Sequence, residues 1–124
     1  MTRARLQTGR IGEEHACEML ASSGISVLER NPRTRAGEID VVALDGRTLV
    51  FVEVKTMRTG SRSGPERPIL AVGPRKQLQV RRLARAWLAE RSPPPHSAIR
   101  FDVIGVSLDP GGRPLAIEHI PNAF

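Results

Sequence analysis

The sequence contains very little cysteine, and its histidines are few and scattered. Cys17 is the only cysteine, which excludes an intramolecular disulfide and a cysteine-based zinc site. The three histidines, His15, His96 and His119, show no metal-ligand spacing. No apolar run approaches the length of a membrane span or follows the charged N-terminus as in a signal peptide. We therefore expect a cytoplasmic protein that does not act on membranes.

Aromatic residues are also scarce, at 3% of the chain, with no tyrosine. The core must therefore be mostly aliphatic, built from Val, Ile, Leu and Ala. No stacking-aromatic motif and no groove-reading helix is visible, so the sequence does not distinguish DNA from RNA as a partner. A length of 124 residues predicts a single domain, residues 1–124, with one modest core.

Lysine is rare in a strongly basic chain. The formal net charge is +6, and only two of the 19 basic residues are lysines, Lys55 and Lys76. Such a charge serves solubility or attracts a polyanion such as nucleic acid. The excess of arginine also fits a base-composition bias of the genome. In that case the two remaining lysines suggest positions where a guanidinium would not serve, because lysine is a compact point charge with a tunable proton affinity.

Periodicity and turn residues predict an α/β fold, with a mixed central sheet flanked by helices in the order α-β-β-β-α-β-β. Thr8 could cap the first helix and Gly24 could end it, Asp45-Gly46 predicts a tight hairpin, and Pro74 fits a helix start. Between the third strand and the second helix we expect a flexible basic loop at 56–68. The expected elements are helices 9–23 and 74–91 and strands 25–29, 38–44, 48–55, 99–108 and 115–120.

The third strand carries unusual residues on one of its faces. Val50, Val52 and Val54 alternate with Phe51, Glu53 and Lys55, so one face is aliphatic and the other holds a carboxylate and an ammonium group. This pattern predicts a strand that is buried on both faces, and charged side chains are unexpected in such a strand.

Asp40 and the Glu53-x-Lys55 pair can together form a divalent-metal site. Mg²⁺ prefers oxygen ligands and usually takes one or two protein carboxylates, here Asp40 and Glu53, with the main-chain carbonyl of Val54 as a third ligand. Lys55 would orient the attacking water and oppose charge that develops on a phosphate. Further candidates are Glu13 on the first helix, to complete the acidic cluster, and Lys76 or Gln77 on the second helix, to reach the phosphate.

Each of these residues also has an ordinary structural interpretation. A Glu-x-Lys pair is common on solvated strand faces, Glu13 could face solvent, and the stem of Lys76 could cover apolar surface. Glu38 shares the strand parity of Asp40 and could replace it, whereas Asp102 fits a paired structural carboxylate better. The arginines that could follow a phosphate backbone, or simply form a basic loop and helix surface, are Arg33, Arg35, Arg58, Arg62, Arg67 and Arg75.

A series of short motifs resembles one known family from end to end. They are Gly9-x-x-Gly12-Glu13-x-x-Ala16, Arg30-Asn31, Gly37-Glu38-Ile39-Asp40, Val50-Phe51-Val52-Glu53-Val54-Lys55, Lys76, Arg100-Phe101-Asp102-Val103-Ile104 and His119-Ile120-Pro121-Asn122-Ala123-Phe124. In order and spacing they are similar to the bacterial YraN-type proteins, whose fold belongs to the PD-(D/E)xK nuclease-like group, with Holliday-junction resolvases and restriction endonucleases. The proline of the superfamily motif is replaced by Ile39.

The resemblance implies Asp40, Glu53 and Lys55 as a catalytic core, with Glu13 and Lys76 or Gln77 in support. We therefore expect an endonuclease that depends on Mg²⁺ or Mn²⁺ and acts on DNA, in a branched or single-stranded form. The first rival is a nucleic-acid-binding module that retains the fold without cutting; the second is a small subunit that docks an acidic protein. Cutting both strands of a junction needs two sites, which would favour a homodimer.

Overall fold

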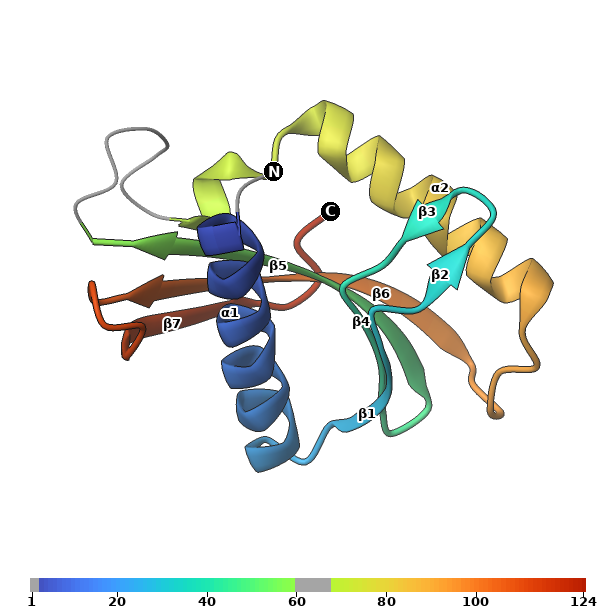
Figure 1. Ribbon diagram of the computed structural model, residues 1–124. Coiled ribbons are helices and arrows are strands. Elements are labelled where there is room, and N and C mark those ends of the chain that lie inside the picture. The colour runs from blue at the N-terminus through green and yellow to red at the C-terminus, as the bar shows by residue number, and fades with distance from the viewer. Residues whose placement is uncertain (1–2, 60–67) are drawn as a thin grey trace.

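A single five-stranded sheet with one helix on each face forms the body of the protein (Figure 1). The computed structural model describes residues 3–59 and 68–124. Strands lie in the order β1-β4-β5-β6-β7, with β5 and β6 parallel and the other neighbours antiparallel. The sequence-predicted mixed sheet flanked by helices is confirmed.

The element order matches the expected one, with two small additions. The pair β2 and β3 forms a separate short ribbon, and a 3-10 helix, η1, precedes α2. Neither was predicted, because two to four residues are too few to show a periodicity. The elements are α1 (Arg3–Ser22), β1 (Ser26–Arg30), β2 (Arg33–Thr34), β3 (Gly37–Glu38), β4 (Val41–Asp45), β5 (Thr48–Arg58), η1 (Pro68–Ala71), α2 (Pro74–Glu90), β6 (Ala98–Leu108) and β7 (Pro114–Ile120).

The two faces of β5 pack against different helices. Val50, Val52 and Val54 join the core beneath α1, whereas Phe51 joins the core beneath α2. All four side chains are buried, as is Glu53 at 7% exposure. The alternation predicted from the sequence is therefore confirmed, and it leaves a carboxylate buried on the α2 side of the sheet.

Three boundaries differ from the prediction. Thr8 does not cap α1, because residues 3–7 are good helix formers and the helix begins at Arg3. β5 continues three residues beyond Lys55, since β6 offers it a parallel partner as far as Arg58 opposite Leu108. The expected basic loop therefore loses its first three residues to the strand and Pro68 to η1. Thr59 forms a turn after β5, and residues 60–67 lie outside the described residues.

Other predicted turn and helix-end residues lie where the sequence indicated. Gly24 has φ +83° just after α1, and the N–H of Ile25 donates to the carbonyl of Leu20 at 2.9 Å, which closes the helix end. Gly46, at φ +61°, turns the chain between β4 and β5, and Pro74 occupies the first turn of α2. Within the described residues, no helix is long and apolar enough to cross a membrane.

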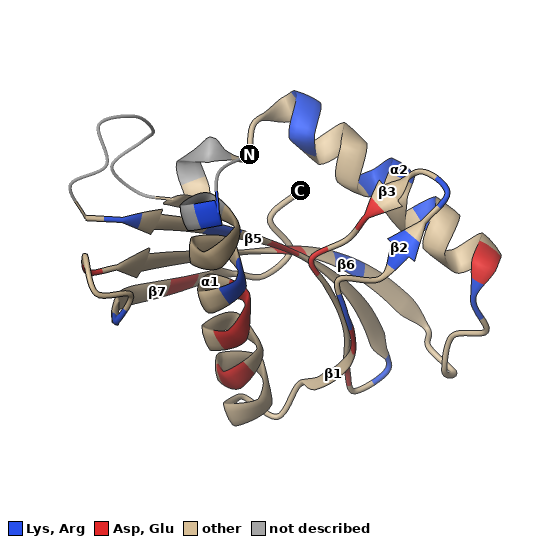
Figure 2. Ribbon diagram, viewed as in Figure 1, with Lys and Arg blue, Asp and Glu red and all other residues tan. Residues whose placement is uncertain are grey.

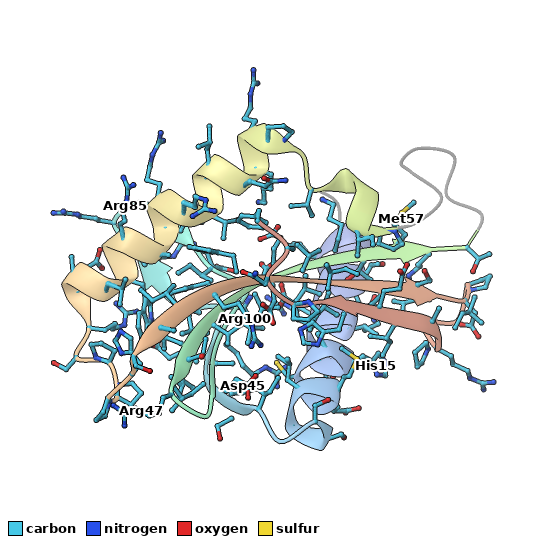
Figure 3. All side chains as sticks on the ribbon, turned by 180° about the vertical axis from the view of Figure 1, so that it is seen from behind. His15, Asp45, Arg47, Met57, Arg85 and Arg100 are labelled. Carbon is cyan, nitrogen blue, oxygen red and sulfur yellow. The ribbon has the colours of Figure 1, made fainter. Side chains whose placement is uncertain are left out.

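Asp102 joins β6 to β7 and to the turn that follows β7, from a fully buried position. Its carboxylate accepts two hydrogen bonds from Arg100, at 2.8 and 3.0 Å, one from the N–H of Asn122 at 3.0 Å, and contacts His119 Nε2 at 2.8 Å. Arg100 also reaches Asp45 at 3.0 Å, and both residues are labelled in Figure 3. These contacts hold the pKa of Asp102 below its usual value despite the opposing effect of burial. The expectation of a paired structural carboxylate is confirmed.

Candidate active site

Glu53 and Asp40 meet on the α2 side of the sheet, beside the start of α2. Asp40 lies in the bend just before β4 rather than within a strand, and its Oδ2 accepts a hydrogen bond from the N–H of Val54 at 2.8 Å. This bond fixes one carboxylate against the strand that carries the other. Hydrogen bonding between Asp40 and Glu53 contributes to the pKa of both groups, which shows that the sequence-predicted pair is brought together.

Lys76 reaches into this pair from α2. Its Nζ lies 3.2 Å from Glu53 Oε1. Lys76 therefore supplies the cation that pairs with the buried carboxylate of Glu53. Lys55 is half-buried two residues after Glu53, on the same face of β5 by alternation. Within the described residues, no ion pair holds the Lys55 ammonium group.

Asn31 connects the remaining acids and was not predicted to belong to the site. Its Nδ2 donates to Glu13 Oε1 at 3.0 Å and to Glu38 Oε1 at 3.2 Å, while its N–H donates to the carbonyl of Asp40 at 2.9 Å. Asn31 has φ +52°, a conformation that asparagine adopts more readily than most residues. The sequence signal was the Arg30-Asn31 motif of the resemblance, which marks the position without indicating a role among carboxylates.

The carboxylates hold protons more tightly than usual. Burial raises the pKa of Glu53 to about 7, the nearby Asp40 carboxylate adds to the rise, and Lys76 opposes it. Burial also raises the pKa of Asp40, against the N–H of Val54, and the pKa of Glu13, against the amide of Asn31. These three carboxyl groups have too little positive charge around them to offset their burial. Each would ionise more readily beside a bound cation.

The donor set fits a divalent cation of the magnesium type. Two facing carboxylate oxygens from Asp40 and Glu53 are the number that Mg²⁺ usually takes from a protein. Among residues 3–59 and 68–124, no three His, Cys, Asp or Glu side chains are arranged as a complete ligand set. The structure places the N–H of Val54 on Asp40, and the Val54 carbonyl and Glu13 stay predicted members of the site.

The other candidates have different surroundings. Gln77 donates to the carbonyl of Val72 at 3.3 Å, so its predicted contact with a phosphate stays a prediction. Glu38 is engaged by Asn31 and lies 3.7 Å from Arg33, and nothing places it on Glu53. Asp102 points from the opposite face of the sheet and does not join the site.

The predicted phosphate-binding arginines divide into exposed and engaged side chains. Arg33, Arg35 and Arg75 are exposed, the last in the first turn of α2. Arg58 was wrongly placed in a loop: it lies on β5, and its guanidinium donates to Thr8 Oγ1 at 2.7 Å and to the carbonyl of Pro110 at 3.1 Å. Arg62 and Arg67 lie outside the described residues.

Charge is segregated around the site. Figure 2 shows acidic positions on β3, before β4 and on β5 near the middle of the sheet, with basic positions along α2 above them. The first turn of α2 carries Arg75 and Lys76 and no acid, although the positive end of a helix dipole disfavours cations. An anion bound near this turn would remove that cost.

Comparison with known proteins gives one consistent result. The profile of the uncharacterised protein family UPF0102 matches residues 12–106. A UPF0102 protein of Streptomyces griseus is 49% identical over 116 residues, covering 94% of each chain. UPF0102 proteins of Frankia alni, 49% identical over 122 residues and 98% of each chain, and of Geobacter metallireducens, 49% identical over 116 residues with 94% and 90% coverage, are similar. The resemblance to YraN-type proteins is thereby confirmed, and the chain belongs to family UPF0102.

Proposed function

We propose that the protein is a metal-dependent endonuclease that hydrolyses phosphodiester bonds in DNA, in the cytoplasm, with Mg²⁺ or Mn²⁺ as cofactor. The observation that carries the proposal is the pair of carboxylates formed by buried Glu53 and half-buried Asp40, with Lys55 and Lys76 on the same side of the sheet. Two acids with raised pKa values, one of them beside an ammonium group at 3.2 Å, form a site that favours added positive charge. A net charge of +6 would bring a polyanion to it.

Each residue has a chemical role in this proposal. Asp40 and Glu53 would hold the cation, which when bound polarises the phosphate and lowers the pKa of water. The N–H of Val54 keeps the Asp40 carboxylate oriented. Lys55 would orient the attacking water, and Lys76 would leave Glu53 for the phosphate once a metal neutralises that carboxylate. Asn31 holds Glu13 at the edge of the pair.

The decisive test is cleavage of single-stranded, duplex and four-way-junction DNA with Mn²⁺ or Mg²⁺. We expect metal-dependent cutting by the wild type and a loss of at least about 100-fold in Glu53→Ala and Lys55→Ala, the size of effect seen when one stabiliser of a charged transition state is removed. Glu14→Gln, an exposed change on α1, is the matched control and should cut normally. If the wild type does not cut, and if it binds DNA in a salt-sensitive way that Glu53→Ala and Lys55→Ala retain, the protein is a non-catalytic nucleic-acid-binding module.

Metal binding can be tested without a substrate. Mn²⁺ at 100 times its dissociation constant should stabilise the wild type by about 2.7 kcal/mol, since a ligand of the folded state shifts unfolding by mass action. Asp40→Asn should abolish that gain, because it removes one of the two carboxylate ligands. Thermal unfolding with Mn²⁺ and with EDTA measures both values. A gain that Asp40→Asn retains in full would place the metal elsewhere. The homodimer stays a prediction that sedimentation can test.

A further inference from the structure

All four aromatic residues of the chain form one continuous run. The sequence has three phenylalanines and one tryptophan. Trp87 meets Phe51 edge-on with ring centroids 5.6 Å apart, Phe51 stacks on Phe101 at 5.8 Å, and Phe101 stacks on Phe124 at 5.4 Å. Trp87 and Phe51 are almost fully buried, whereas Phe101 and Phe124 are partly exposed. The run therefore leads from the core to the surface.

The outer end of the run lies beneath an exposed guanidinium. Arg81 of α2 is 4.7 Å from the Phe101 ring centroid and 5.7 Å from that of Phe124. The outermost ring is held in place by the backbone around it. The N–H of Ala123 donates to the carbonyl of Phe101 at 2.7 Å, and the N–H of Asn122 donates to the buried Asp102. Figure 1 shows this tail crossing the sheet and ending near the first turns of α2.

The aromatic run passes beside the candidate active site at Phe51. Phe51 and Glu53 lie on the same face of β5, two residues apart. Lys76, which pairs with Glu53, and Arg81 both extend from α2 toward this side of the sheet. Two steps of 5.8 and 5.4 Å separate the ring of Phe51 from that of Phe124. A nucleic-acid strand held at Glu53 covers such a span within a few nucleotides.

We infer that Phe124 and Arg81 form a stacking site for an unpaired nucleobase, on the strand whose phosphodiester lies at Asp40 and Glu53. This inference rests on the proposed function for its choice of ligand. A partly exposed ring beside a guanidinium is the combination that binds single strands without reading their sequence, since every base has a flat face. Bases within a duplex have both faces covered by neighbours. The site therefore selects single-stranded or branched nucleic acid over uninterrupted duplex.

The inference differs measurably from a purely structural role for the tail. If Phe124 only covers Phe101, any apolar side chain of similar volume serves, and Phe124→Leu leaves binding unchanged. If the ring of Phe124 stacks on a base, the leucine of Phe124→Leu still covers Phe101 but cannot stack on the base, and binding weakens. Arg81→Gln removes the guanidinium, and Arg85→Gln is its matched control, because Arg85 extends from the outer side of α2 (Figure 3).

The experiment measures binding in EDTA, so that cleavage does not interfere. The probes are a single-stranded DNA oligonucleotide containing 2-aminopurine, the same sequence as RNA, and the corresponding DNA duplex. We expect quenching of 2-aminopurine by the wild type, and an affinity for single strands at least about fivefold lower in Phe124→Leu and Arg81→Gln, the loss expected for one base–aromatic stack. Duplex affinity should not change in Phe124→Leu. In Arg81→Gln it should fall only by the amount that the loss of one charge causes, which Arg85→Gln measures with all probes.

Several outcomes would overturn the inference. They are wild-type affinity for single strands in Phe124→Leu, an equal loss for single strands and duplex, and absence of binding by the wild type. Thermal unfolding of each variant shows whether the fold is intact, and Arg81→Gln answers the question even if Phe124→Leu unfolds. Tighter binding of the DNA probe than of the RNA probe would identify the ligand as DNA. Equal affinity would mean that the site recognises the flat faces of the bases, which DNA and RNA share. Quenching without metal-dependent cutting would refute the proposed nuclease and retain the stacking site.

Discussion

Glu53→Gln should make the metal-free protein more stable at pH 8. The pKa of Glu53 is raised from 4.5 to about 7, first by burial and then by Asp40. The folded state thus binds a proton that the unfolded chain has released, and stability from this group falls as the pH rises from 4.5 through 7. Above pH 7 the cost is on the order of 3 kcal/mol. The neutral amide of Gln does not carry this cost. Glu53→Gln also removes the ion pair with Lys76, but Lys76 is 38% exposed, so that pair contributes little to stability.

The pH dependence identifies the cause of this gain. In EDTA, the melting temperature of Glu53→Gln should exceed that of the wild type by roughly 10 °C at pH 8. At pH 5 most of the difference should disappear, because the wild-type carboxyl group is then protonated in the folded state. Glu14→Gln, which makes the same change in charge at an exposed position on α1, should give no comparable gain at either pH. An equal gain at both pH values would mean that burial of charge is not responsible.

Gly12→Ala should destabilise the protein although alanine favours helices. A Cβ atom at Gly12 would overlap the hydroxyl oxygen of Thr56 on β5 and lie 2.8 Å from its Cβ. Rotation of the threonine moves the hydroxyl but not that Cβ, so α1 must move away from the sheet. Overpacking of this kind costs about 1–3 kcal/mol. Because Glu13 is the next residue, the same shift would weaken its contact with Asn31.

A neighbouring glycine provides the control. Gly9 lies on the same helix, and a Cβ atom there meets nothing within 4 Å. Gly9→Ala should therefore stabilise the protein by up to about 1 kcal/mol, the helix propensity of alanine over glycine. Urea unfolding of both variants should give opposite signs. Adding Thr56→Gly should remove most of the Gly12→Ala penalty in a double-mutant cycle, and additive effects would show that the two residues do not interact.

Local patterns predicted the fold well and the site in part. The alternation along β5 identified Glu53 as a buried carboxylate, because a charged residue inside an aliphatic strand conflicts with the pattern around it. The hairpin at Asp45-Gly46 placed Asp40 near that strand. The positions of Asp40, the hairpin and Glu53 along the chain therefore predicted that the two carboxylates lie close together.

Contacts between distant segments were beyond such patterns. Nothing near Asn31 indicates that its amide joins Glu13 to Glu38, since these residues are separated by turns and by the α1–β1 connection. Aromatics at 51, 87, 101 and 124 show no local motif, and only the packing of β5, β6, α2 and the tail brings them together. The extent of β5 likewise depended on its partner, β6.

The parallel pairing of β5 with β6 has a consequence for how the chain folds. Thr48 pairs with Ala98, so the centre of the sheet joins segments about 50 residues apart, and closing so long a segment slows folding. The β4–β5 hairpin needs only a local turn and can form earlier. Asp40 and Glu53 thus come together in a hairpin still open to water on the α2 side. Their repulsion becomes costly only when β6 and α2 dock, which makes the closing step of folding the one most sensitive to pH.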